Sequence, residues 1–365
     1  MAFSLIDALR RFLPDFLESG SPLNPDQRRA VRAIEHCRTP AMGGQLYTCQ
    51  KCGDRVFAYH SCNHRACPQC GRDATRKWVE RELGKRINAP YFMVTFTLPA
   101  ELRSLFFGPS AKEACDLFFA ATSVSLREKL AAPKGLAAKV SGFTAVLHTW
   151  NQQLLFHPHI HYLVPGAGIN AEGDVVRVKK EDFLLHIPVL KKAFRYHFRR
   201  GLETKDWGVD PAVWTKDWGI NIQPFGSGVN AVKYLGAYVS RIAIGDRRIV
   251  SIDDRTVTFQ WKDRADNGRT KLQRVSGHEF VKRYLRHVTP RGLRTIRYYG
   301  FCHPAAKKNR ERIRFHTGLP LEIGSSKTAD EEDSRACGIP QCPRCHKPMK
   351  RTGSFNTPRL ARAPP

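Results

Sequence analysis

The sequence has no uninterrupted run of about 18 apolar residues, the length that an α-helix needs to cross a bilayer. We therefore expect no membrane span. A secretory signal is not evident either, because the first apolar stretch contains Asp7 and is followed by Pro14. This stretch predicts an amphipathic helix over residues 3–13 that stops at the proline. We expect an intracellular protein.

Acidic residues are scarce, since 33 Asp and Glu stand against 60 Lys and Arg, giving a net charge of +27 and a pI near 10.0. Such an excess favours binding to a polyanion, and nucleic acid is the usual one. A membrane surface is the alternative, but the basic residues are spread along the chain instead of lying on one amphipathic helix. Nucleic acid is therefore the expected partner.

A disulfide framework is not expected, although the chain has 11 cysteines, because nothing indicates secretion. Two pairs, Cys49-Gln-Lys-Cys52 and Cys67-Pro-Gln-Cys70, are separated by 14 residues, and a glycine follows each. Thiolates in tight turns at this spacing predict one structural four-thiolate Zn²⁺ site, whereas buried or redox cysteines are the simpler alternative. Other potential ligands lie nearby and could form a second site, or Cys62 could replace one of the four. These further candidates are Cys37, Cys62 and His64.

The C-terminal region contains a second, smaller group of potential zinc ligands. Its members are Cys337, Cys342, Cys345 and His346. They suggest a small zinc knuckle, preceded by a polar and acidic linker over residues 322–335. The tail over residues 351–365 has no periodic pattern and is expected to be disordered.

At 365 residues, the chain is long enough for two or three domains. Between the cysteine groups, the expected order is strand, helix, strand, strand, which predicts an α+β fold with a central antiparallel sheet flanked by helices. Strands are predicted over residues 91–98, 142–155, 156–164, 218–224 and 294–299, a β-hairpin over 247–261, and helices over 24–36, 72–86, 111–130, 182–200, 229–241 and 279–288.

The predicted strand over residues 156–164 carries three histidines at alternate positions. Alternate side chains of a strand share a face, so His157, His159 and His161 should point the same way, opposite Ile160 and Tyr162. Two imidazoles at this spacing make half of a metal site. A set of exposed surface histidines is the alternative.

Two tyrosines lie four residues apart in the predicted helix that follows Gly226-Ser-Gly228. This spacing places Tyr234 and Tyr238 on one helix face, one turn apart. Taken alone, the pattern is more often an aromatic stripe in a core. Combined with the histidine strand and the basic, cysteine-rich composition, it indicates a specific family.

The chain resembles the rolling-circle transposases of the IS91 insertion-sequence family, which belong to the HUH nuclease superfamily. The resemblance runs from about residue 23 to 345, and one departure is Ala66, where the family usually has a histidine before the third knuckle cysteine. The motifs that carry it are Asn63-His-Arg-Ala-Cys-Pro-Gln-Cys70, Pro90-Tyr-Phe-Met-Val-Thr-Phe-Thr-Leu-Pro99, Leu147-His-Thr-Trp-Asn-Gln152, His157-Pro-His-Ile-His161, Val164-Pro-Gly166, Tyr234-Leu-Gly-Ala-Tyr238 and Arg297-Tyr-Tyr-Gly-Phe301.

The resemblance implies a bacterial, nucleoid-associated enzyme that cleaves and rejoins single-stranded DNA at transposon ends and target, through a 5′-phosphotyrosine. The family's tyrosine nucleophiles fall on Tyr234 and Tyr238. Its metal-binding pair, which holds Mg²⁺ or Mn²⁺, falls on His159 and His161, so His157 is an extra histidine. A hard cation also wants an oxygen ligand. Gln152 is the candidate, on the strand neighbouring His159 in a tight hairpin, and Asn230 is the alternative.

This interpretation divides the chain into an N-terminal helical segment (1–36), a zinc-binding domain (37–75), an HUH catalytic domain (85–316), a linker (317–336), a C-terminal zinc knuckle (337–350) and a tail (351–365). Three rival functions are a replication initiator or relaxase with the same chemistry, a catalytically inert zinc-dependent DNA-binding protein, and a His-x-His metal oxygenase. The oxygenase gives no reason for the large positive charge.

Overall fold

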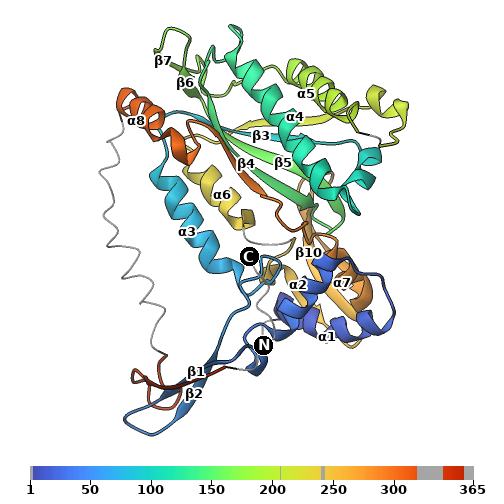
Figure 1. The fold of residues 1–365 in the computed structure, drawn as a ribbon, viewed down its shortest axis with the longest axis vertical. Helices are drawn as coiled ribbons and strands as arrows, with labels where there is room; N and C mark the ends of the chain where they lie inside the picture. The colour runs from blue at the N-terminus through green and yellow to red at the C-terminus, as the bar shows by residue number, and fades with distance from the viewer. Residues whose placement is uncertain (1–2, 206, 240–242, 319–339, 357–365) are drawn as a thin grey trace.

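A computed structural model of the chain describes residues 3–205, 207–239, 243–318 and 340–356, without the side chains of residues 71–74, 237 and 238. Its centre is a five-stranded antiparallel sheet in the order β12-β4-β5-β3-β8, shown in Figure 1. This confirms the predicted α+β class. The strands are β3 (Tyr91–Thr97), β4 (Gly142–Trp150), β5 (Phe156–Pro165), β8 (Gly219–Pro224) and β12 (Ile296–Gly300).

Helices cover both faces of this sheet, and together they form the central domain (Figure 1). On one face, α4 (Ala111–Ala131) and α5 (Ile187–Leu202) bury a core of aromatic residues against the strands. Cys115 lies in this core. The other face holds α3 (Gly71–Gly84), α6 (Val229–Val239) and α8 (Lys307–His316). A short hairpin, β6 (Ala167–Ile169) and β7 (Val175–Arg177), extends from β5.

A second domain joins the N-terminal helices to a segment more than 200 residues later. Residues Leu5, Phe12 and Phe16 share one core with Phe259 and Phe280. The described part of the predicted N-terminal segment (1–36) therefore folds together with residues 243–288. The elements of this second domain are α1 (Leu5–Glu18), α2 (Pro25–His36), β9 (Ile249–Ile252), β10 (Thr256–Asp263), β11 (Arg269–Ser276) and α7 (Gly277–Leu285).

The first helix does not stop at Pro14, so that prediction is wrong. Helix α1 continues to Glu18 with Pro14 inside it, although proline cannot donate the usual backbone hydrogen bond. The apolar stripe extends past the proline to Phe16, which is buried in the second core. Burial of an aromatic ring of this size stabilises by a few kcal/mol, enough to offset the one missing hydrogen bond.

A third, small unit is a three-stranded sheet, which we call the ribbon. Strand β1 (Gly44–Thr48) lies at its centre, between β2 (Arg55–Tyr59) and β13 (Lys350–Phe355). The prediction of a disordered tail from residue 351 is therefore wrong for residues 351–355, which pair with β1 from 300 residues away. Tertiary pairing supplies order that the local sequence pattern does not show.

The predicted linker and Cys337 lie outside the described residues. Among the helices that are described, none is long and apolar enough to cross a membrane.

Candidate active site and cysteine centres

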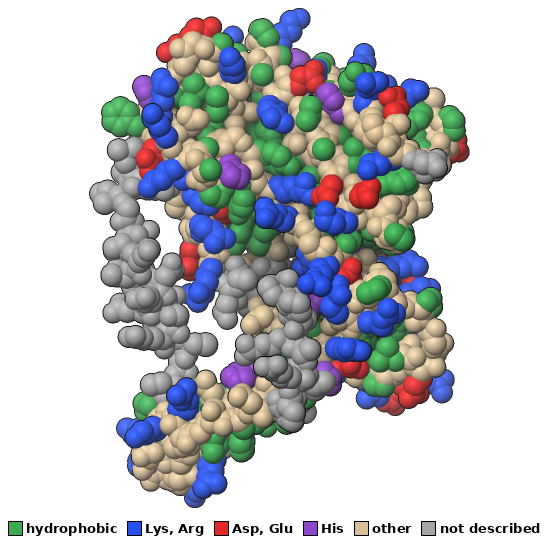
Figure 2. Space-filling view, in the orientation of Figure 1, with side chains coloured by type: hydrophobic (Ala, Val, Ile, Leu, Met, Phe, Trp, Pro, Cys, Tyr) green, Lys and Arg blue, Asp and Glu red, His purple; other side chains and the backbone are tan. Residues whose placement is uncertain are grey.

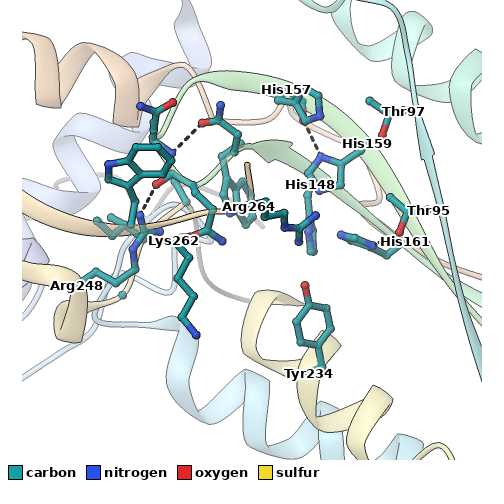
Figure 3. A pocket seen from close by; sticks show the side chains of 18 of the residues that line it. Thr95, Thr97, His148, His157, His159, His161, Tyr234, Arg248, Lys262 and Arg264 are labelled. Carbon is teal, nitrogen blue, oxygen red and sulfur yellow. Dashed lines mark hydrogen bonds between the residues drawn. The ribbon is translucent and has the colours of Figure 1, made fainter. Parts of the chain in front are cut away.

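A cavity of about 1180 Å³ lies where the central sheet meets the second domain. The histidine strand β5 and its neighbour β4 form one wall, and α6 contributes Tyr234. The second domain contributes basic side chains, including Arg248, Lys262 and Arg264, as Figure 3 shows.

Three histidines converge in this cavity. His159 and His161 lie two residues apart on β5 and share a face, as predicted, with ring centroids 4.8 Å apart. His148 on β4 lies directly opposite His159 in the antiparallel register. Its ring centroid is 5.3 Å from that of His159 and 4.6 Å from that of His161. The three offer nitrogen atoms within 4.8 Å of one another, close enough to bind one metal ion.

Hydrogen bonds fix the orientation of two of these rings, and burial keeps all three uncharged. The Nδ1–H of His159 donates to the backbone carbonyl of His157 over 2.7 Å, which leaves Nε2 as the ring nitrogen able to bind a metal. His161 Nδ1 lies 2.8 Å from the hydroxyl of Thr95. Burial lowers the pKa of His159 to about 4 and holds the pKa values of His148 and His161 well below the usual range. The imidazoles are therefore neutral near pH 7, the form that binds metal.

The other candidate ligands are placed differently. His157 lies outside the three-histidine group, and its Nδ1 accepts a 2.8 Å hydrogen bond from Arg103. Gln152 lines the cavity but lies in the turn after β4, not on the strand as predicted. Asn230 is exposed and does not line the cavity.

His148 was missed from the sequence because the register of the hairpin was misjudged. The predicted tight hairpin would place Gln152 on the strand that neighbours His159. The register shifts between His148 and Trp150, and residues 151–155 form the connection. The sequence does contain a signal for this ligand. His148 lies within the preceding predicted strand (142–155), where its side chain could face His159 across the hairpin.

Tyr234 faces the histidines from α6. Its ring centroid is 6.3 Å from that of His161, with the two planes at 89°. Figure 3 shows its hydroxyl pointing toward the histidine group. Tyr238 lies one turn later in the same helix, and its side chain is outside the described residues.

Gly236 allows α6 to approach α3 closely. A Cβ at this position would lie 2.1 Å from Cγ2 of Val79 in α3. Helix α3 is itself attached to the sheet, because Nε1 of Trp78 donates a 2.9 Å hydrogen bond to the hydroxyl of Tyr298. This packing sets the distance of Tyr234 from the sheet.

A guanidinium connects the two walls of the cavity. Arg248, beside β9, donates from Nε to the carbonyl of Gln260 over 2.8 Å and from its terminal nitrogen to the carbonyl of Gln152. Lys262 and Arg264 are exposed on the same side. The cavity therefore presents positive charge opposite the histidines, as a phosphate backbone requires.

The cysteines form two groups of four, but not the predicted four. The thiols of Cys67 and Cys70 lie with those of Cys37 and Cys62, two of the further candidates, and the Sγ atoms of Cys37 and Cys70 are 3.5 Å apart. Cys62 lies 3.6 Å from Cys70. His64 is not in the group, because its Nδ1 accepts a hydrogen bond from the backbone N–H of Ala66.

The second group joins the other predicted pair to the C-terminal cysteines. It contains Cys49, Cys52, Cys342 and Cys345. Of the C-terminal candidates that the structure describes, Cys342 and Cys345 belong to this group and His346 does not. The topology explains this grouping. The β1–β2 hairpin is inserted between Cys37 and Cys62, so Cys49 and Cys52 lie in the ribbon, apart from the other cysteines of the N-terminal region.

Comparisons with known proteins agree with these features. A family model described as a putative transposase matches residues 142–310, which include all three histidines and both tyrosines. A model described as a transposase zinc-binding domain matches residues 8–98. A putative transposase of Sinorhizobium fredii, y4qJ, is 34% identical over 369 residues, covering 93% of this chain and 92% of the relative. The transposase for insertion sequence element IS801 of Pseudomonas savastanoi pv. phaseolicola is 27% identical, covering 78% and 72%. No solved structure gives a significant match.

These matches define a DNA transposase with an N-terminal zinc-binding domain, whose cysteine groups support structural zinc. The particular family follows from the relatives and from the zinc-binding module. The chain belongs to the IS91 family of transposases, which confirms the resemblance drawn from its motifs.

Proposed function

We propose that this transposase cleaves and rejoins single-stranded DNA through a 5′-phosphotyrosine intermediate during rolling-circle transposition. The observation that carries the proposal is the position of Tyr234, which faces three clustered imidazoles in a cavity with a basic opposite wall. A nucleophile, a metal-binding group and positive charge for the phosphate backbone are thus within one site.

His148, His159 and His161 would hold the catalytic divalent cation. Their nitrogen atoms lie close enough for one ion, and burial keeps the rings neutral, so the residues fit. A bound cation stabilises the charge that develops on the scissile phosphate. Because three nitrogen ligands suit a softer cation, we expect Mn²⁺ to support activity better than Mg²⁺.

Tyr234 is the proposed nucleophile for the first cleavage. Its phenol oxygen attacks the phosphorus, the bond from phosphorus to the 3′ oxygen breaks, and the departing oxygen is protonated to a free 3′ hydroxyl. The 5′ end remains on the tyrosine. One phosphodiester replaces another, so the reverse step rejoins a strand without ATP.

Tyr238 is the proposed second nucleophile. Its place one turn after Tyr234 in α6 puts both on the same helix face. Two tyrosines could hold two DNA ends in turn, as strand transfer requires. Because its proposed substrate is DNA, we expect the enzyme to act at the bacterial nucleoid.

The zinc-binding domain would hold one structural Zn²⁺ through Cys37, Cys62, Cys67 and Cys70. Four thiolates around one ion make a closed site that stabilises the fold without taking part in cleavage. The cluster lies just before α3, which packs on α6, so we propose that it positions the helix beneath Tyr234.

Covalent capture of DNA tests the nuclease proposal. The protein is incubated with single-stranded oligonucleotides covering transposon ends, with Mn²⁺, and denaturing gels detect a protein–DNA adduct. We expect the adduct with wild type, a strong reduction with Tyr234→Phe, and none with Tyr234→Phe, Tyr238→Phe together. Tyr196→Phe is the matched control, because Tyr196 is 59% exposed on α5, away from the cavity.

An adduct that survives loss of both tyrosines would overturn the assignment of the nucleophiles. DNA binding without any adduct would instead indicate a catalytically inert DNA-binding protein.

A further inference from the structure

The ribbon contains a second cluster of four thiols, assembled from the two ends of the chain. Cys49 and Cys52 lie in the turn between β1 and β2, and Cys342 and Cys345 lie just before β13. The Sγ–Sγ distances are 3.5 Å from Cys49 to Cys345, 3.4 Å from Cys52 to Cys342 and 3.7 Å from Cys52 to Cys345. Cys342 is fully buried and Cys49 is 2% exposed.

The two cysteine pairs lie in turns of the same type, with matching backbone hydrogen bonds. The N–H of Cys49 donates to the carbonyl of Asp54 over 2.8 Å, and the N–H of Gly53 donates to the carbonyl of Cys49 over 3.0 Å. In the C-terminal pair, Cys342 donates to Lys347 over 2.9 Å, and His346 donates to Cys342 over 2.9 Å.

Each turn also has a left-handed residue directly after its second cysteine. Gly53 has φ of 75°, and His346 has φ of 55°. Glycine adopts this conformation freely, but a histidine does so at some cost. The tertiary structure therefore holds His346 in the conformation that the turn requires, and its imidazole is not part of the four-thiol group.

We propose that these four cysteines bind a second structural Zn²⁺, which fastens the C-terminal segment to the β1–β2 hairpin. Zinc–sulfur bonds of about 2.3 Å in a tetrahedron place the sulfur atoms about 3.8 Å apart, close to the spacing in this cluster. Neither pair is sufficient alone, because a closed structural site needs four ligands. The site lies outside the nuclease cavity and does not depend on the proposed cleavage chemistry.

The metal would join the two segments at the end of the ribbon next to Thr48 and Lys350, in addition to the pairing of β13 with β1 and the contacts of Phe355 with Phe57 and Tyr59. The apolar residues buried with the thiols in this cluster include Met349, which is 2% exposed. So small a core cannot stabilise a three-stranded sheet by itself, and a structural metal is the usual substitute. Strand β13 should therefore stay paired with β1 only when zinc is bound.

Zinc content per chain tests the proposal. The full-length protein should contain two Zn²⁺ by mass spectrometry of the metal. The double variant Cys342→Ser, Cys345→Ser should contain one, retained by the other cluster, and Cys62→Ser should also lose one. Cys302→Ser is the matched control and should keep two, since Cys302 belongs to neither cluster. Wild type with one zinc, or the double variant with two, would overturn the proposal.

Alkylation of the unmodified protein covers the case in which a variant fails to fold. With zinc bound, Cys49, Cys52, Cys342 and Cys345 should resist iodoacetamide, and chelation should expose all four together. Equal modification of Cys342 and Cys345 before and after chelation would contradict the proposal, as would a disulfide between the two pairs.

Discussion

At the scale of single residues, His148 is the addition that the structure makes to the site. It is buried, and it lies opposite His159 on the neighbouring strand. Gln152, four residues after His148, is in the connecting turn. The third ligand proposed for the cation is therefore a nitrogen from a strand instead of an oxygen from a turn.

Removal of His148 should weaken metal binding more than removal of Gln152. We expect His148→Ala to reduce Mn²⁺ affinity at least about tenfold, because losing even a supporting residue of a metal site costs that much. Gln152→Ala should change the affinity much less. Titration calorimetry with Mn²⁺ on both variants checks this, and a larger loss in Gln152→Ala would reverse the assignment.

His287 should make the stability of the fold depend on pH. It is 1% exposed, its Nε2–H donates to the carbonyl of Leu154 over 3.1 Å, and its Nδ1 lies 3.2 Å from the hydroxyl of Thr149. Burial lowers the pKa of His287 from 6.5 to about 4. Between these values the unfolded chain binds more protons, so the contribution is complete above pH 6.5 and lost as pH falls toward 4.

The expected size of this contribution is about 3 kcal/mol between pH 7 and pH 4. His287→Gln should therefore lose that much less unfolding free energy than wild type over the same range. Denaturant unfolding of both proteins at several pH values measures the difference. Protonation of the other groups affects both proteins alike and cancels, so parallel pH profiles would exclude His287 as the cause.

At the scale of elements, the position of α6 depends on the absence of one methyl group. Gly236→Ala should force α6 and α3 apart, because the new Cβ would overlap Val79. Overpacking of this kind costs about 1–3 kcal/mol of stability. Since Tyr234 lies on α6, we also expect a lower yield of covalent adduct.

A compensating change provides the control for this prediction. Val79→Ala removes the methyl group that Gly236→Ala would meet, so the double variant should recover both stability and adduct yield. Thermal unfolding and adduct assays on the two single variants and the double variant form a mutant cycle. Additive losses in the double variant would show that the two helices do not conflict at this point.

At the scale of the whole molecule, charge is the dominant property. Figure 2 shows Lys and Arg side chains spread over the visible face, including the region between the central and second domains. The sum of +27 attracts a polyanion from solution. The basic side chains of the cavity wall then attract the polyanion toward the cavity.

The salt dependence of DNA binding should report the contribution of individual cavity residues. For single-stranded DNA, each phosphate contact steepens the plot of log affinity against log salt by about 0.7. Lys262→Gln should make the slope shallower by about this amount. Lys134→Gln, an exposed position that does not line the cavity, should not change it. Fluorescence anisotropy over a salt series measures both, and equal slopes would place Lys262 off the DNA path.

Alternation, helical spacing and composition are local properties, and the sequence encodes their consequences directly. It predicted the shared face of His159 and His161, the helix that carries Tyr234, and the polyanion as partner. These features depend on neighbours a few residues away. Family-wide motifs then supplied the class of protein.

Contacts between residues far apart in the chain depend on the folded structure. His148 reaches His159 through a strand register, the N-terminal helices join residues 243–288, and each cysteine pair finds partners other than those nearest in sequence. A spacing along the chain fixes the shape of one turn, but long-range strand pairing and burial determine which two turns share a metal. For that reason the ligands could be recognised from the sequence, whereas their grouping could not.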